Sequence, residues 1–198
     1  MNTAHLALTT LSKQVATLPN AITTAGTHGL AKNMILANLL FFGAYHLSNG
    51  SSKQRFQTWF VMTPSSSYTT LLTTHFAHTN PFSLAFNCYI ISTVGASLLK
   101  SRGCAGFMLI GGLAAAGSSL FAAADMRHDS TKSYTGGLGL SAGLVTYSAF
   151  RYPDGLRVLS RLSPITLVGL SVAYGLYCED KSVIGGVTAG YLAFLMAL

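Results

Sequence analysis

The chain has 198 residues, of which 50% are hydrophobic and only 9% carry a charge. Soluble domains carry roughly 25% charged residues, so this composition excludes an ordinary water-exposed surface. The formal net charge of +7 does not indicate nucleic-acid binding. Its bases stand singly or in pairs between apolar runs, whereas a phosphate-binding surface gathers them in one block.

The apolar runs predict an all-α integral membrane protein. Lipid leaves helices and closed barrels as the only spanning structures, and barrel strands alternate apolar with polar residues. Here the runs are continuous and rich in Gly, Ala and Leu. Three cysteines without metal-ligand spacing indicate small apolar side chains rather than a metal site. We expect no metal, and no cofactor other than bound lipids.

Residues 1–28 form a first region without any acidic residue, and it is rich in Thr and Ala. Apolar residues recur in it at steps of three and four, which indicates one face of a helix. They are Leu8, Leu11, Val15, Leu18 and Ile22. We expect an amphipathic segment that docks on a membrane or on a partner subunit. An organelle transit segment has the same composition and is the alternative.

Six apolar runs follow in residues 29–198, and we expect each to be a transmembrane helix. They cover about 29–47, 80–99, 103–124, 134–150, 163–178 and 182–198. Asn80-Pro81 and Ser163-Pro164 are typical helix starts, with a capping side chain before a proline. Several runs are shorter than the ~20 residues of an upright span, which indicates a thinned bilayer or burial against neighbours.

The first loop, 48–79, is long and contains the segment RFQTWFVM around Trp59, the only tryptophan. Aromatic residues of this kind gather where a membrane meets water. The segment therefore predicts a helix that lies along the lipid headgroups.

Three motifs in order along the chain resemble the rhomboid family of intramembrane serine proteases. They are LLTTHFAHTNPFSLAFN at the second run, GLSAG in the fourth and GGVTAG in the sixth. The resemblance covers roughly residues 32–198 and implies a six-helix rhomboid-like bundle. It also implies a polar motif in the second span and a nucleophilic serine in the fourth.

The resemblance assigns roles to individual residues. In the family, two histidines and an asparagine of the second span bind the oxyanion. On this chain those places fall on His78, Ser83 and Asn87, so that a serine replaces the second histidine. The nucleophile's place falls on Ser141, with Gly139 two residues before it.

The family's catalytic base is missing from this chain. Its place in the sixth span falls on Val183, directly after Ser182. A serine hydroxyl is a weak nucleophile until a neighbouring base takes its proton. Loss of one member of such a unit typically lowers the rate by about 10⁴ to 10⁶. We therefore interpret the site as degenerate and expect a pseudoprotease.

The same residues also have plain structural interpretations. A serine among glycine and alanine, such as Ser141, lets helices approach closely, and Asn87 suits a buried hydrogen bond between helices. Gly186 and Gly190 form a G-x-x-x-G pattern, which predicts close helix packing in the last span.

These patterns predict an inactive rhomboid-like membrane protein that serves as a structural or accessory subunit of a membrane complex. The acid-poor start and the pI of about 9.5 suggest the mitochondrial inner membrane, in a respiratory or ATP synthase assembly. Its expected partners are lipids and other subunits, not nucleic acid. The alternative is an active protease that uses Ser141 with a displaced base. A carrier is less well supported, because the spans show neither internal charges nor an inverted repeat.

Overall fold

The structure is a computed structural model, and it describes residues 29–154 and 163–196. The regular secondary structure of the described residues is helical, apart from an isolated β-bridge between Met62 and Tyr134. The prediction of an all-α chain is therefore confirmed. The expected docking segment, residues 1–28, lies outside the described residues.

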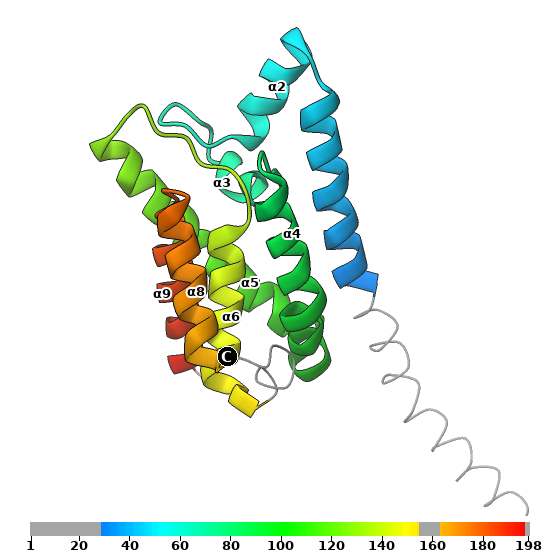
Figure 1. Cartoon of the computed structure of the whole chain (residues 1–198), viewed down its shortest axis with the longest axis vertical. Coiled ribbons are helices and arrows are strands. Elements are labelled where there is room, and N and C mark those ends of the chain that lie inside the picture. Colours follow the sequence, from blue (N-terminus) through cyan, green and yellow to red (C-terminus); the bar gives the residue numbers. More distant parts are fainter. Residues whose placement is uncertain (1–28, 155–162, 197–198) are drawn as a thin grey trace, which may run out of the picture.

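The first helix, residues 29–47, and α2 (Gly50–Phe60) form a hairpin that stands at one side of the bundle (Figure 1). Aromatic packing joins the two helices, because the Phe41 ring lies 4.6 Å from that of Phe60 and Phe60 stacks on Phe56 at 4.5 Å. A helix is therefore present at the predicted interfacial segment. Trp59 near its end is 58% exposed, as an aromatic anchor at a membrane surface would be.

Two short turns, α3 (Thr70–Thr73) and η1 (Thr74–Phe76), lead into α4 (Pro81–Ile90). The side chain of Asn80 accepts a hydrogen bond from the backbone N–H of Phe82 at 2.8 Å, so the predicted helix start is confirmed. α4 continues through the π-helical turn η2 (Ile91–Gly95) into α5 (Ala96–His128).

A backbone break at Gly103 divides this long helix. Gly103 has φ 69° and ψ −178°, a conformation that residues with a Cβ rarely adopt. Without the break, the 48 residues from Pro81 to His128 would extend about 72 Å, more than twice the thickness of a bilayer core. Instead the chain reverses there, and Figure 1 shows the second arm of α5 running back past α4. The predicted second and third runs meet at this break.

The centre of the bundle is α6 (Leu138–Arg151), which packs against α5, α8 (Pro164–Tyr177) and α9 (Ser182–Leu195). Every residue of α6 from Leu138 to Ala149 is buried. α6 begins four residues later than the sequence predicts, because Tyr134 exchanges backbone hydrogen bonds with Met62 at 2.9 Å. Gly136, with φ 97°, then turns the chain into the helix.

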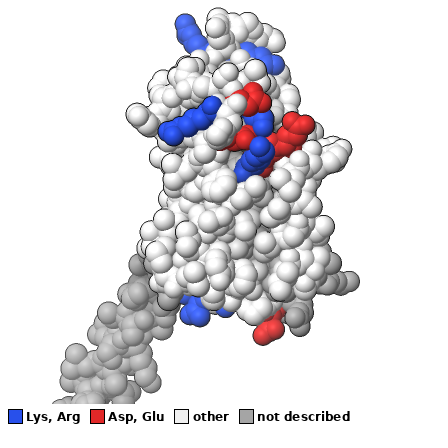
Figure 2. Space-filling model, turned by 90° about the vertical axis from the view of Figure 1, so that its left-hand side faces the viewer, with Lys and Arg blue, Asp and Glu red and all other residues white. Residues whose placement is uncertain are grey.

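The surface of the bundle is apolar around its middle. Among the described residues, the stretch Pro81–His128 is the one helix long and apolar enough to cross a membrane, and Ile165–Tyr177 and Ser182–Leu195 are shorter apolar helices. On the face in Figure 2, charged side chains gather toward the two ends and leave a band without charge between them. Large exposed apolar side chains include Leu40, Phe82, Met108, Leu120, Ile165, Leu170 and Leu192. This distribution favours a membrane environment.

Candidate functional site

Glycine contacts set the position of α9 against its neighbours. A Cβ on Gly186 would lie 1.8 Å from the carbonyl oxygen of Gly139, and a Cβ on Gly190 would lie 2.2 Å from that of Gly143. The backbones of α9 and α6 therefore touch directly at these positions. We call these four residues the glycine seam. It brings the start of α9 beside the first turns of α6, where Ser141 lies.

A chain of buried hydrogen bonds connects α6 to α4. The Ser141 hydroxyl donates to Asn87 Oδ1 at 2.5 Å, and Asn87 Nδ2 donates to His78 Nε2 at 3.2 Å. Because Nε2 accepts this bond, the proton of the neutral imidazole is on Nδ1, which donates to Ser83 Oγ at 3.2 Å. The four residues, named here the polar chain, are all buried. The structure thus brings together the four polar residues that the resemblance singled out.

The His78 imidazole in the polar chain is neutral near pH 7. Burial lowers the pKa of His78 to about 4, with a smaller effect from the neighbouring His75. Burial likewise lowers the pKa of His75 to about 4. His75 does not belong to the polar chain. Its Nε2 instead lies 3.1 Å from the Ala115 carbonyl oxygen and 3.0 Å from Ser119 Oγ, both of α5. It fastens η1 to the bundle.

Val183 fills the place that the resemblance gives to a catalytic base. It is 2% exposed and packs with Leu138 and Ala142 of α6, which lie three residues before and one residue after Ser141. Its methyl groups also fill the space beside Gly175 of α8, where a Cβ would approach Val183 Cγ2 to 2.4 Å. The start of α9 therefore presents a closely packed aliphatic group to α6.

The hydrogen bonds of the polar chain orient the Ser141 hydroxyl but do not deprotonate it. An amide oxygen holds the Ser141 proton, and an amide is far too weak a base to remove it. The His78 ring connects to Ser141 only through Asn87, and its accepting nitrogen is occupied by the amide. A Cβ on Gly137 would lie 2.8 Å from Asn87 Oδ1, so the backbone closes over the amide.

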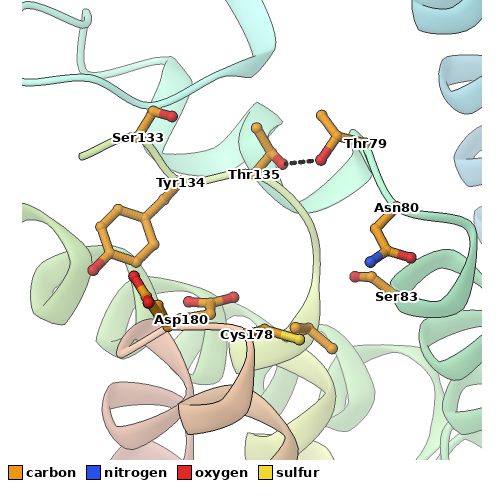
Figure 3. Close-up of a pocket in the computed structure, with 10 residues that line it drawn as sticks. Thr79, Asn80, Ser83, Ser133, Tyr134, Thr135, Cys178 and Asp180 are labelled. Carbon is orange, nitrogen blue, oxygen red and sulfur yellow. Dashed lines mark hydrogen bonds between the residues drawn. The ribbon is translucent and has the colours of Figure 1, made fainter. Parts of the chain in front are cut away.

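A polar cavity of about 240 Å³ lies at the loop end of the polar chain. In Figure 3, Ser83 and Asn80 lie on one side and Tyr134 on the other, with Cys178 and Asp180 below. The hydroxyls of Thr79 and Thr135 approach to 3.4 Å and close the opposite edge. The polar chain therefore ends at this cavity through Ser83.

Asp125 ties the loops around this cavity together. Its carboxylate accepts hydrogen bonds from Lys132 at 2.9 Å, from Lys181 at 2.7 Å and from the Tyr134 hydroxyl at 2.5 Å. These partners come from the α5–α6 and α8–α9 loops. The third predicted run ends at residue 124, just before Asp125, whereas α5 extends to His128. Nothing in the local sequence identifies its partners, which lie up to 56 residues away.

Among the described residues, no group of three or more His, Cys, Asp or Glu side chains is arranged to hold a metal ion. No protein-family model matches the chain, and no curated protein matches its sequence. The assignment of function therefore depends on the geometry above and on the motifs in the sequence.

Proposed function

We propose that this chain is a rhomboid-like membrane protein without protease activity, which serves as a structural subunit of a membrane complex. The observation that carries the proposal is the aliphatic packing of Val183 beside α6. A protease of this kind needs a proton acceptor at that place, and Ser141 instead donates to an amide. The glycine seam and the polar chain then serve to hold the helices together.

The arrangement of helices supports a six-span bundle. We count the arms 81–102 and 104–128 as two spans, because the break at Gly103 separates them. α6, α8 and α9 have 14 residues each and extend about 21 Å, less than the ~30 Å of a hydrocarbon core. Spans this short favour a locally thinned bilayer. A subunit of this shape would deform the membrane around a larger assembly.

The location that we propose is the mitochondrial inner membrane, in a respiratory or ATP synthase assembly. The support is compositional: residues 1–28 lack acids, and the whole chain has a pI of about 9.5. Isolation of the chain from its own membranes in mild detergent, followed by native mass measurement, tests the subunit role. Stable association with other membrane subunits is expected, and a monomer without partners would contradict it.

A fluorophosphonate probe tests the absence of protease activity. We expect no covalent labelling of Ser141 under conditions in which an active serine hydrolase added to the same detergent is labelled. The competing function is a protease that uses His78 as a displaced base, which the hydrogen bond from Asn87 to His78 makes worth testing. Labelling that disappears in Ser141→Ala would establish that activity and overturn the proposal.

A further inference from the structure

Arg102, at the end of the bundle opposite the cavity, has hydrogen-bond donors without partners. Its Nε and Nη2 atoms are buried and have no hydrogen-bond partner among the residues that the structure describes. The side chain folds over the first turn of the returning arm of α5, since a Cβ on Gly106 would lie 2.7 Å from Arg102 Cβ. The reversal at Gly103 therefore places the base of this side chain against the returning arm.

The surroundings of Arg102 are basic. Its guanidinium interacts with the side chains of Tyr147 and Tyr152 at the end of α6. The Arg151 guanidinium lies 5.8 Å from the centre of the Tyr152 ring. Lys100, two residues before Arg102 on the same helix arm, is exposed. Within the described residues, both ion pairs of the chain are made by Asp125, at the far end of α5. No described carboxylate therefore neutralises Arg102.

Buried guanidinium donors without acceptors are unfavourable. Arg102 as a whole is only half-buried, so its side chain can turn these donors outward, where an anionic group from outside the protein would complete them. Arginine presents its donors in a planar fork that matches the two oxygens of a phosphate. The site lies at the edge of the apolar surface, at the level where lipid headgroups would sit. Met108 and Leu109, exposed in the second turn of the returning arm, offer adjoining apolar surface for acyl chains.

We propose that Arg102, with Lys100 and Arg151, binds the phosphate of an anionic phospholipid headgroup. The inference rests on the membrane insertion that is part of the proposed function, and it is independent of the state of Ser141. Failure of lipid binding at Arg102 would leave the fluorophosphonate result unchanged, so the two proposals fail separately.

The experiment is a titration of the purified full chain in phosphatidylcholine-containing micelles, with phosphatidylglycerol added and thermal unfolding as the readout. We expect phosphatidylglycerol to stabilise the wild-type chain. In Arg102→Gln the apparent affinity should fall about tenfold or more, because charge-assisted hydrogen bonds to phosphate are lost. Arg102→Lys, which keeps the charge but not the fork, should fall between the two. The matched control is Arg127→Gln, an exposed base near the other end of α5, which should behave like the wild type.

Equal stabilisation of wild type and Arg102→Gln would overturn the site. If Arg102→Gln does not fold, as judged by its helical circular dichroism, Arg102→Lys decides, and wild-type affinity in that variant would overturn the proposal. In a second arm, inorganic phosphate is added in place of phosphatidylglycerol. A full stabilising effect of inorganic phosphate would show that the ligand is a free anion and would overturn the assignment to lipid.

Discussion

The glycine seam and the polar chain both lie on α6, and they hold it by different means. In the seam, α6 and α9 touch through backbone atoms, and a Cβ at Gly186 or Gly190 would overlap a carbonyl oxygen. In the polar chain, α6 meets α4 through side chains whose hydrogen bonds range from 2.5 to 3.2 Å. The glycine seam depends on the absence of side chains, whereas the polar chain depends on each polar atom having a hydrogen-bond partner.

This difference separates what the helical frame needs from what hydrolysis would need. Backbone contact in the seam tolerates no substitution by a larger residue, so it limits how far the sequence can change while the bundle persists. The polar chain is complete without a base, because Asn87 satisfies both Ser141 and His78. With the aliphatic Val183 beside α6, no side-chain polar atom of the polar chain is therefore left buried without a partner.

The largest expected effect follows from enlarging the seam. In Gly186→Leu the new side chain would overlap the Gly139 carbonyl, so α9 and α6 would have to separate. We expect a loss of more than about 3 kcal/mol, the upper range for overpacking, and failure to form the compact bundle. Thermal unfolding and size-exclusion chromatography in detergent measure it.

Gly169→Leu is the matched control for this prediction. Gly169 is exposed on α8, and a Cβ there would meet nothing within 4 Å. The control should unfold at the wild-type temperature or slightly above, since leucine favours a helix more than glycine does. Similar losses in both variants would show that the seam is not a special contact.

The second prediction separates the polar chain from the glycine seam by the pH dependence of stability. The pKa of both His75 and His78 falls from 6.5 in the unfolded chain to about 4 in the folded protein. The unfolded chain therefore binds more protons between these values, and stability present above pH 6.5 is lost as pH falls. At pH 4 the loss is about 3 kcal/mol for each histidine. The seam contains no titratable side chain and contributes nothing to this loss.

Chemical unfolding measured from pH 7 to pH 4.5 tests this loss. The Gln side chain in His78→Gln cannot be protonated but keeps a donor and an acceptor. In this variant the slope of the unfolding free energy against pH should be roughly halved. Burial raises the pKa of the Asp180 carboxyl, so this group adds stability as pH falls. Its effect is the same in the wild type and in His78→Gln, and it therefore cancels when the two slopes are compared. An unchanged slope in His78→Gln would contradict the assignment to the polar chain.

The smallest expected effect compares the middle of the polar chain with its end. Asn87→Ala leaves the Ser141 hydroxyl and His78 Nε2 unsatisfied in a buried place, which should cost about 2 to 3 kcal/mol of unfolding free energy. Ser83→Ala should cost less than about 1 kcal/mol, because water in the adjacent cavity can accept from His78.

Urea unfolding of both variants measures the difference, with Asn33→Ala as a control at an exposed asparagine of the first helix. Equal costs for Asn87→Ala and Ser83→Ala would show that the chain is not more sensitive at its middle. A cost for Asn33→Ala as large as that for Asn87→Ala would indicate a general effect of the substitution.

Local sequence predicted much of the helical architecture. The starts at Asn80-Pro81 and Ser163-Pro164 are confirmed, because each capping side chain accepts a hydrogen bond inside its own first turn. Apolar runs located the helices within a few residues. The break at Gly103 coincides with the boundary between two runs, although its backbone reversal needs the left-handed region that composition cannot specify.

Contacts between distant segments could not be predicted in the same way. α6 begins at Leu138 rather than near Tyr134 because Tyr134 pairs with Met62, 72 residues before it. At the candidate site, the resemblance named the polar residues, but the order of their hydrogen bonds depends on packing between α4 and α6. The three-way link at Asp125 and the partner-free donors of Arg102 carry no local pattern at all.

The reversal at Gly103 has a consequence for how the protein enters a membrane. Because a single glycine, without an intervening soluble loop, joins the arms 81–102 and 104–128, neither arm can be released into lipid without the other nearby. If both arms cross the membrane as proposed, Lys100 and Arg102 at the bend lie at one membrane face, and the far ends of both arms lie at the other. A residue with a Cβ at 103 would be strained in this conformation, so the close turn that holds the two arms together would be destabilised.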